Sequence, residues 1–295
     1  MRWPVDSRIR RVFAASEVTL RSEGKVVEGA PGTRNVEVAR MTEITKALPI
    51  LAAYDIPYRD RGQYWAGGQN DPESYPAWVQ AYADGIGNRP AAVILEPDGL
   101  TLTDCLDKTQ TAERFELLPA AIDTFEAKPQ VDVYIDSGHV AWLPAAEAAR
   151  RLKLTGIERA AGFSINVSNF QTTADSVAYG LTVSDAIGAE GGTHFVIDTS
   201  RNGNGPWESD DPEAWCNPPG RALGDAPTVK TADPLVDAYL WFKRVGESDG
   251  SCRNGPGAGQ WYPDYALGLV RNAGDPTASP GASPETQAAT PESGG

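Results

Sequence analysis

Two acidic residues flank a proline directly after an apolar run, and this short segment is where the sequence could carry chemistry. The run covers residues 93–95, and Glu96, Pro97 and Asp98 follow it. Because proline cannot donate to a β ladder and restricts the residue before it, we expect the strand to stop here with Glu96 extended. Asp98 then lies at the C-terminal end of a strand, where α/β folds carry catalytic groups. The alternative is that Asp98 only caps the next helix.

Polar segments follow nearly every strand that the sequence predicts. Apolar, β-branched runs predict strands over residues 48–54, 91–95, 131–135, 162–166, 193–197 and 236–242, and helical patterns predict helices near 73–87, 109–128, 143–153 and 174–188. Strands that alternate with helices indicate βαβ crossovers and a mainly parallel sheet, whose C-terminal ends share one edge. We therefore expect one cleft there, lined by carboxylates, amides and a lysine. The polar segments cover residues 54–60, 96–98, 136–139, 166–169, 198–206 and 243–250.

A cluster of acids suits the hydrolysis of a glycosidic bond. That reaction needs one carboxylic acid with a raised pKa to protonate the leaving oxygen, and a second carboxylate to handle water or attack carbon. Burial and neighbouring negative charge both raise a carboxyl pKa. Serine hydrolase chemistry fits poorly, because the chain has two histidines and no G-x-S-x-G elbow. Residues 203–206 lack the Lys-Ser/Thr ending of a P-loop.

Composition favours a neutral ligand. The chain has 295 residues and a net charge of −14, which argues against nucleic acid and anionic membranes as partners. No apolar run is long enough to span a bilayer, and the N-terminus shows no signal peptide. Several of the eight tryptophans stand beside glycine, proline or acidic residues, where their rings could stack on sugars or simply cover the core. These are Trp65, Trp207, Trp215 and Trp261.

The composition also divides the chain. Residues 272–295 are rich in Pro, Ala, Ser, Thr and Gly without large apolar side chains, which predicts a disordered tail or linker. We expect a catalytic domain over 36–271, preceded by a divergent or truncated segment over 1–35. The cysteines form no C-x-x-C pair, so we expect no structural zinc. Cys216 and Cys252 lie in Gly/Pro-rich surroundings and could bridge a loop in an exported protein, which leaves Cys105 over.

Taken in order, these segments resemble glycoside hydrolase family 6, the cellulases that cleave β-1,4-glucan with inversion. The matching strings are YDIPYRD (54–60), VILEPD (93–98), YIDSGH (134–139), GFSINVSN (162–169), DTSRNGNGP (198–206) and DAYLWFK (237–243) leading into GESDG (246–250). They cover about residues 47–262. The resemblance implies an α/β fold, a distorted and incompletely closed parallel β/α barrel of about seven strands.

The resemblance also implies roles for particular residues. By position, Asp98 is similar to the general acid, Asp60 to the loop aspartate that raises the pKa of the acid, and Asp249 to the base, acting directly or through a water relay. Asp136 matches a supporting aspartate near the acid, although a purely structural role is an equal alternative. The substrate contacts that it implies are Tyr54, His139, Trp142, Asn166, Trp215, Lys243 and Glu247.

Two departures from the family concern the cysteines and the N-terminus. The resemblance pairs Cys216 with Cys252. Arg61 stands where many members carry a second bridging cysteine, so we expect Cys105 to be a free, largely buried thiol. The N-terminal residues do not show the usual first strand with its sugar-stacking aromatic, and residues 12–20 are a candidate substitute strand. A distal glycone-side subsite is therefore in doubt.

The implied function is endo-acting, inverting hydrolysis of cellulose or a related β-glucan by a secreted, monomeric protein without a cofactor or metal. The stretch from Asn202 to Leu235 and the short tail after Glu247 leave little chain for long loops that could roof the cleft, which favours an endoglucanase. The alternatives are a cellobiohydrolase of the same family and a non-catalytic glucan-binding protein with a degraded N-terminal subsite. An inverting pair implies acid and base carboxyls roughly 6.5–9.5 Å apart.

Overall fold

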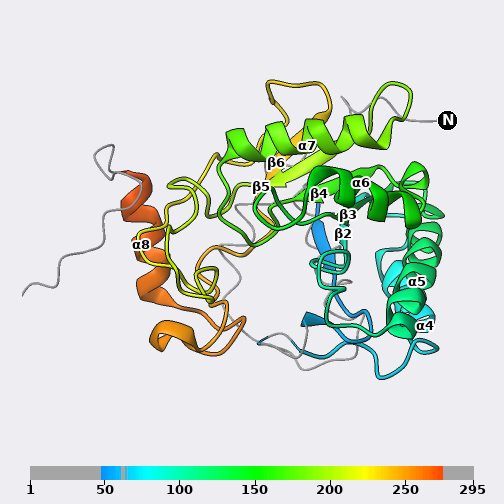
Figure 1. Ribbon diagram of the computed structural model, residues 1–295, viewed down its shortest axis with the longest axis horizontal. Helices are drawn as coiled ribbons and strands as arrows, with labels where there is room; N and C mark the ends of the chain where they lie inside the picture. Colours follow the sequence, from blue (N-terminus) through cyan, green and yellow to red (C-terminus); the bar gives the residue numbers. More distant parts are fainter. Residues whose placement is uncertain (1–47, 61–63, 65, 275–295) are drawn as a thin grey trace, which may run out of the picture.

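One curled parallel sheet organises the protein. The computed structural model describes residues 48–60, 64 and 66–274 (Figure 1). The strands, which pair in chain order, are β1 (Ile50–Ala53), β2 (Ala91–Leu95), β3 (Val131–Asp136), β4 (Gly162–Ile165), β5 (Phe195–Asp198) and β6 (Val236–Leu240). Because β1 and β6 form the two edges, the sheet is a half-barrel that does not close upon itself within the described residues. This confirms the predicted open barrel, with six described strands where about seven were expected.

Helices cover the outer face of the sheet. The crossovers between β1 and β5 carry α4 (Tyr75–Ile86), α5 (Lys108–Glu126), α6 (Ala145–Leu154) and α7 (Thr173–Ile187). Short 3₁₀ turns occupy Ile157–Arg159, before β4, and Cys252–Asn254, after β6. A further helix, α8 (Pro263–Ala273), was not predicted, and it runs past the expected domain end at residue 271. The N-terminal segment 1–35, its candidate strand and nearly all of the tail lie outside the described residues. No helix in the described part is long and apolar enough to cross a membrane.

Apolar side chains pack on both faces of the sheet. In β2, Val93 and Leu95 belong to the larger cluster between sheet and helices, whereas Ile94 joins a smaller cluster with Tyr134 and Leu240. Successive side chains of a strand point to opposite faces, so a strand buried on both sides is apolar along most of its length. All five residues of β2 are buried. This sheet is a rigid support for the loops at its C-terminal edge.

The residue before Pro97 departs from expectation. Glu96 is not extended but has a φ of +48°, a conformation that costs free energy and needs surrounding support. Its buried carboxylate supplies that support by accepting hydrogen bonds from the Asp55 and Ile56 N–H groups and, at 2.8 Å, from the Tyr75 hydroxyl. Burial raises the pKa of Glu96 to about 7, and these hydrogen bonds act against that rise. Glu96 therefore ties the end of β1 to β2 and leaves the cleft to Asp98.

Candidate active site

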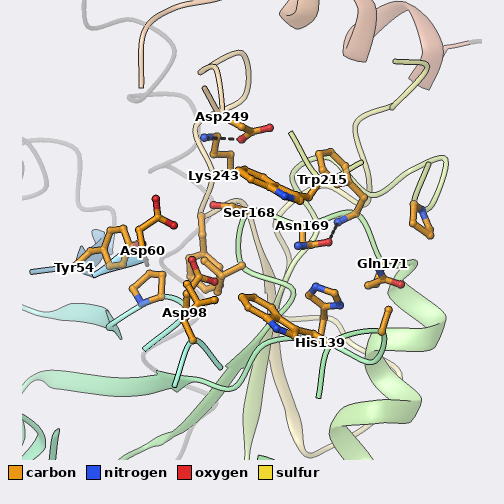
Figure 2. Close-up of a pocket in the computed structure, with 18 of the residues that line it drawn as sticks. Tyr54, Asp60, Asp98, His139, Ser168, Asn169, Gln171, Trp215, Lys243 and Asp249 are labelled. Carbon is orange, nitrogen blue, oxygen red and sulfur yellow. Dashed lines mark hydrogen bonds and ion pairs between the residues drawn. The ribbon is translucent and has the colours of Figure 1, made fainter. Parts of the chain in front are cut away.

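A cleft of about 850 Å³ lies at the C-terminal edge of the sheet (Figure 2). It contains side chains from the segments that follow all six strands. Every predicted site residue lines it except Asn166 and Asp136. Those that line it are Tyr54, Asp60, Asp98, His139, Trp142, Trp215, Lys243, Glu247 and Asp249.

Asp98 and Asp136 form a coupled acidic pair. The Asp98 N–H donates to Asp136 Oδ2 at 2.7 Å, so the last residue of β3 anchors the turn that carries Asp98. Burial, together with the negative charges of Asp136 and Asp60, raises the pKa of Asp98 well above its usual range. Burial also raises the pKa of Asp136 to about 7, against the hydrogen bonds that it accepts. The pair therefore retains a proton near neutral pH, as a general acid requires.

The alternative reading of Asp98 as a helix cap is wrong. The following helix, α5, begins ten residues later in the chain, and its N-cap is Asp107. The Asp107 carboxylate accepts from the N–H groups of Thr109 and Gln110, at 2.8 and 2.9 Å. The side chain of Asp98 is thus available to the cleft, which it lines.

Tyr54 lies beside the acid. Burial raises the pKa of its phenol, and the negative charges of Asp98 and Asp60 raise it further. The phenol consequently stays protonated and donates to Asp98, which opposes the rise in the pKa of Asp98. The Arg59 guanidinium packs over the Tyr54 ring, 4.7 Å from its centroid. These contacts hold the aromatic ring at the end of β1, against the cleft.

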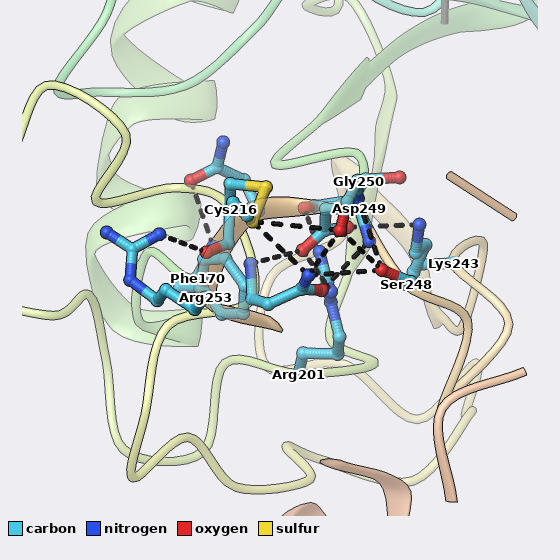
Figure 3. A network of polar contacts seen from close by, with 12 residues as sticks. Phe170, Arg201, Cys216, Lys243, Ser248, Asp249, Gly250 and Arg253 are labelled. Atoms are coloured by element: carbon cyan, nitrogen blue, oxygen red, sulfur yellow. Dashed lines mark hydrogen bonds and ion pairs between the residues drawn. A yellow bond between two sulfur atoms is a disulfide. The ribbon is translucent and has the colours of Figure 1, made fainter. Parts of the chain in front are cut away.

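Asp249 has the opposite electrostatic character. Its carboxylate makes ion pairs with Arg201 at 2.8 Å and Lys243 at 3.0 Å, and accepts from the Asn217 N–H at 3.0 Å (Figure 3). Burial alone would raise the pKa of Asp249, but the two cations outweigh burial and lower it. Asp249 is therefore an anion near neutral pH, where Asp98 keeps its proton.

Sequence reasoning missed the buried cation in this network. Arg201 has 0% of its surface exposed, and its guanidinium also lies over the Phe170 ring, 4.4 Å from the centroid. The sequence signal for Arg201 is its position in the polar segment that follows β5, three residues after Asp198. Such a segment predicts a residue at the cleft edge, but not which carboxylate an arginine reaches. Other lining residues that were not singled out are Ser168, Asn169 and Gln171. Trp207, one of the tryptophans named as able to stack on sugars or cover the core, also lines the cleft.

Aromatic and neutral polar side chains form the rest of the cleft wall. His139 lies against Trp142 with ring centroids 5.5 Å apart, and burial lowers the pKa of His139 to about 4, so its ring is neutral near neutral pH. Trp215 meets Tyr64 edge to face, with centroids 6.0 Å apart. Burial raises the pKa of Glu247, against its ion pair with an adjacent arginine. Flat apolar rings beside hydrogen-bonding groups are suited to sugar rings.

Asn166 does not contact the cleft. Its Nδ2 donates to the backbone oxygens of Gln171 and Asp198, at 3.2 and 2.9 Å, and its Oδ1 accepts from the Gln171 N–H at 3.0 Å. The Asn166 amide is thus satisfied inside the protein, with 0% of the residue's surface exposed. Asn166 holds the loop after β4, whose next residues line the cleft.

The disulfide is formed as predicted between Cys216 and Cys252, which are 36 residues apart in the sequence. The bridge places Asn217, the residue after Cys216, beside the segment that carries Asp249. There the Asn217 side chain accepts a hydrogen bond from the Asp249 N–H at 2.9 Å and donates one to the Gly250 carbonyl. The bridge therefore joins the loop of Trp215 to the loop of Asp249. Cys105 is free as predicted but exposed, not buried, because it lies in the turns between β2 and α5.

We expect one thiol to react with a thiol reagent in the native oxidised protein, because Cys105 is exposed, and still one after denaturation. Reducing the bridge should lower the free energy of unfolding by about 2–4 kcal/mol, as expected for a loop of this length. Cys105→Ser is the control and should leave no reactive thiol. Three reactive thiols in the oxidised, denatured protein would contradict the bridge.

Within the described residues, no group of three or more His, Cys, Asp or Glu side chains is arranged to hold a metal ion. The groups that the chain brings together are an acid with a raised pKa, a carboxylate with a lowered pKa and aromatic walls. Two carboxyls with pKa values moved apart are the recognised arrangement for acid and base roles.

Comparison with known proteins agrees with this geometry. The profile of Glycosyl hydrolases family 6 matches residues 14–273. The chain belongs to this family. Among its relatives, Endoglucanase 1 of Streptomyces sp. (strain KSM-9) is 43% identical over 81% of the chain, and Endoglucanase A of Cellulomonas fimi is 46% identical over 76%. These matches cover 66% and 47% of the two relatives, so the chain spans less than two thirds of their length.

A solved structure supports the family 6 fold. The endoglucanase Cel6 from Mycobacterium tuberculosis, determined in complex with methyl-cellobiosyl-4-deoxy-4-thio-β-D-cellobioside, superposes with a TM-score of 0.79. It is 47% identical, and the match covers 83% of this chain and 82% of that one. The half-barrel is therefore the fold of this family.

Proposed function

We propose that this protein hydrolyses internal β-1,4-glucosidic bonds of cellulose or a related β-glucan, with inversion at the anomeric carbon. The observation that carries the proposal is the electrostatic contrast inside one cleft. Asp98 is held protonated by burial and by its acidic neighbours, whereas Asp249 is held ionised by Arg201 and Lys243. Glycoside hydrolysis by a general acid needs this pairing of one neutral and one charged carboxyl.

Each carboxyl then has a step in the reaction. Asp98 donates its proton to the leaving glycosidic oxygen, while water adds to the anomeric carbon from the opposite face of the sugar. Asp249 takes up the proton of that water directly or through a second water. Because its pKa is lowered, Asp249 is a weaker base than an ordinary aspartate.

Endo action is supported by the relatives and by the chain. The relatives described above are named endoglucanases at 43% and 46% identity. The segment between β5 and β6 folds without a helix or strand and includes Trp207 and Trp215 in the cleft wall.

We propose that the protein is a monomer that binds a β-glucan chain. We also propose that it is exported from the cell, where a disulfide persists. A cellobiohydrolase remains the alternative within the family.

A purely glucan-binding role is disfavoured by the same contrast. Binding a neutral sugar gains nothing from burying an acid beside Asp136 and Asp60, because that arrangement costs free energy. A catalytic acid requires it. The cleft therefore has features that binding alone does not explain.

We expect the protein to release reducing ends from carboxymethylcellulose and to form the α-anomer first from a soluble β-linked oligosaccharide. Inversion follows from water attack on the face opposite the leaving group. Proton NMR of the fresh anomeric signal, recorded before mutarotation, reads the outcome, and buffer with boiled protein is the control. If the β-anomer appears first, the mechanism is not inverting and Asp249 is not its base. If no cleavage occurs, the alternative of a non-catalytic glucan-binding protein is favoured.

A further inference from the structure

A buried arginine on α5 contacts the loops that carry Asp60 and Asp98. Arg114 has only 2% of its surface exposed and lies in the second turn of the helix. Among the described residues, no carboxylate accepts a hydrogen bond from its guanidinium. Its partners are four backbone carbonyl oxygens, and a charged donor makes such bonds stronger than a neutral one.

The four carbonyls belong to two separate loops. Arg114 Nη2 donates to Pro57 O at 2.7 Å and to Tyr58 O at 3.1 Å, in the loop after β1 that leads to Asp60. Arg114 Nη1 donates to Gly99 O at 3.2 Å and to Leu102 O at 3.4 Å, in the turns after Asp98. One planar group thus fixes the distance between two segments that are about forty residues apart in the chain.

Both loops need external support. Tyr58 and Asp60 have φ values of +61° and +57°, and Asp98 has +64°, a region in which non-glycine residues cost free energy. Such conformations persist only where surrounding contacts determine them. The Arg114 bonds to Pro57 and Tyr58 supply those contacts on the Asp60 side.

We propose that Arg114 is a positioning residue that holds the loop of Asp60 at a fixed place beside the turns of Asp98. The inference rests on the proposed function, in which Asp98 is the general acid. The guanidinium suits this task because its two terminal nitrogens diverge in a fixed plane, one toward each loop. A lysine ammonium is a single point charge and cannot reach both loops in the same geometry. Burial lowers the pKa of Arg114, yet an arginine stays charged at any physiological pH.

The proposal has an electrostatic consequence. The groups that face Asp98 are Asp136, Asp60 and Tyr54; the two acids raise the pKa of Asp98 and the phenol lowers it. If the Asp60 loop moves away, one negative charge is lost from this set. The pKa of Asp98 then falls, and the alkaline limb of kcat/KM moves to lower pH.

Arg151 provides a matched control. It reaches from α6 to the same turns after Asp98, where it donates to Leu100 O, Thr101 O and Thr103 Oγ1. It also pairs with Glu147 on its own helix. None of these partners belongs to the loop after β1, so Arg151→Gln removes support from the Asp98 side alone.

The test compares Arg114→Gln, Arg114→Lys and Arg151→Gln by amide hydrogen exchange and by the pH profile of kcat/KM. We expect both Arg114 variants to exchange at least about tenfold faster at residues 58–60 and in the turns after Asp98, with the glutamine variant the more severe. Arg151→Gln should change only those turns. We also expect kcat to fall about 10–100-fold in Arg114→Gln. In the same variant, the alkaline limb of kcat/KM should move to lower pH by at least about 0.5 pH unit.

Two results would overturn the proposal. One is wild-type exchange at residues 58–60 in a folded Arg114 variant, and the other is an unmoved alkaline limb despite faster exchange. If Arg114→Gln does not fold, Arg114→Lys decides the same question, because it keeps the charge and the bulk. Exchange needs no substrate, so an inactive wild-type protein would defeat the proposed function while the exchange data still decide whether Arg114 couples the loops.

Discussion

Replacing Asp98 by asparagine should lower kcat/KM on a soluble β-glucan by about 10²–10⁴-fold near neutral pH, the usual contribution of a general acid. The asparagine side chain is nearly isosteric but has no proton to give to a leaving oxygen. The variant should stay folded, because the recorded tie between Asp98 and Asp136 uses the backbone N–H of Asp98, which asparagine retains. Initial rates and a urea unfolding curve measure the two effects separately.

Asp136→Asn is the matched comparison, since it alters the neighbour and not the acid. Removing the Asp136 charge should lower the pKa of Asp98. Because activity needs protonated Asp98, kcat/KM falls as the pH rises through that pKa, so the alkaline limb of this variant should begin at lower pH.

For the acid itself, an Asp98→Asn protein that keeps more than about a tenth of wild-type kcat/KM would remove Asp98 from the role of acid.

The strands were predictable because burial on both faces leaves a direct mark on the sequence. β2 matches its predicted range of residues 91–95, since its apolar run is bounded by Pro90 on one side and Glu96-Pro97 on the other. The carboxyl end of each strand then fixes where polar side chains converge. The shared edge of the strand ends, together with the family resemblance, predicted nine side chains that do line one cleft.

The remaining features depend on contacts between distant segments. Glu96 adopts a positive φ because Asp55, Ile56 and Tyr75 bind its carboxylate, and no local rule for a residue before proline contains those partners. The same holds for Arg114, whose carbonyl partners come from two other loops. α8 was missed because its apolar positions stand among Gly and Pro residues, next to the low-complexity tail.

Replacing Asp249 by asparagine should be costly for both stability and activity. Arg201 and Lys243 are 0% and 7% exposed, so the variant would leave two buried cations without their shared anion. Removing one partner of a buried ion pair typically costs about 3–5 kcal/mol. Urea unfolding near neutral pH measures this loss. We also expect kcat to fall by about 10²-fold or more, because no anion then accepts the proton of the attacking water.

The pH dependence separates this ion network from a simple packing defect. The folded-state pKa of Asp249 is lowered, so its stabilisation is fully present above the unfolded pKa of about 3.9 and is lost as the pH falls through the folded value. The gap in unfolding free energy between wild type and Asp249→Asn should therefore shrink toward acidic pH. In a double-mutant cycle, Lys243→Met should cost less in the Asp249→Asn background than in the wild type, because it removes a cation that has lost its partner. A gap that is constant with pH, or additive costs in the cycle, would mean that the Asp249 charge does not hold the two cations, and Asp249 would then lose its assigned part in the reaction.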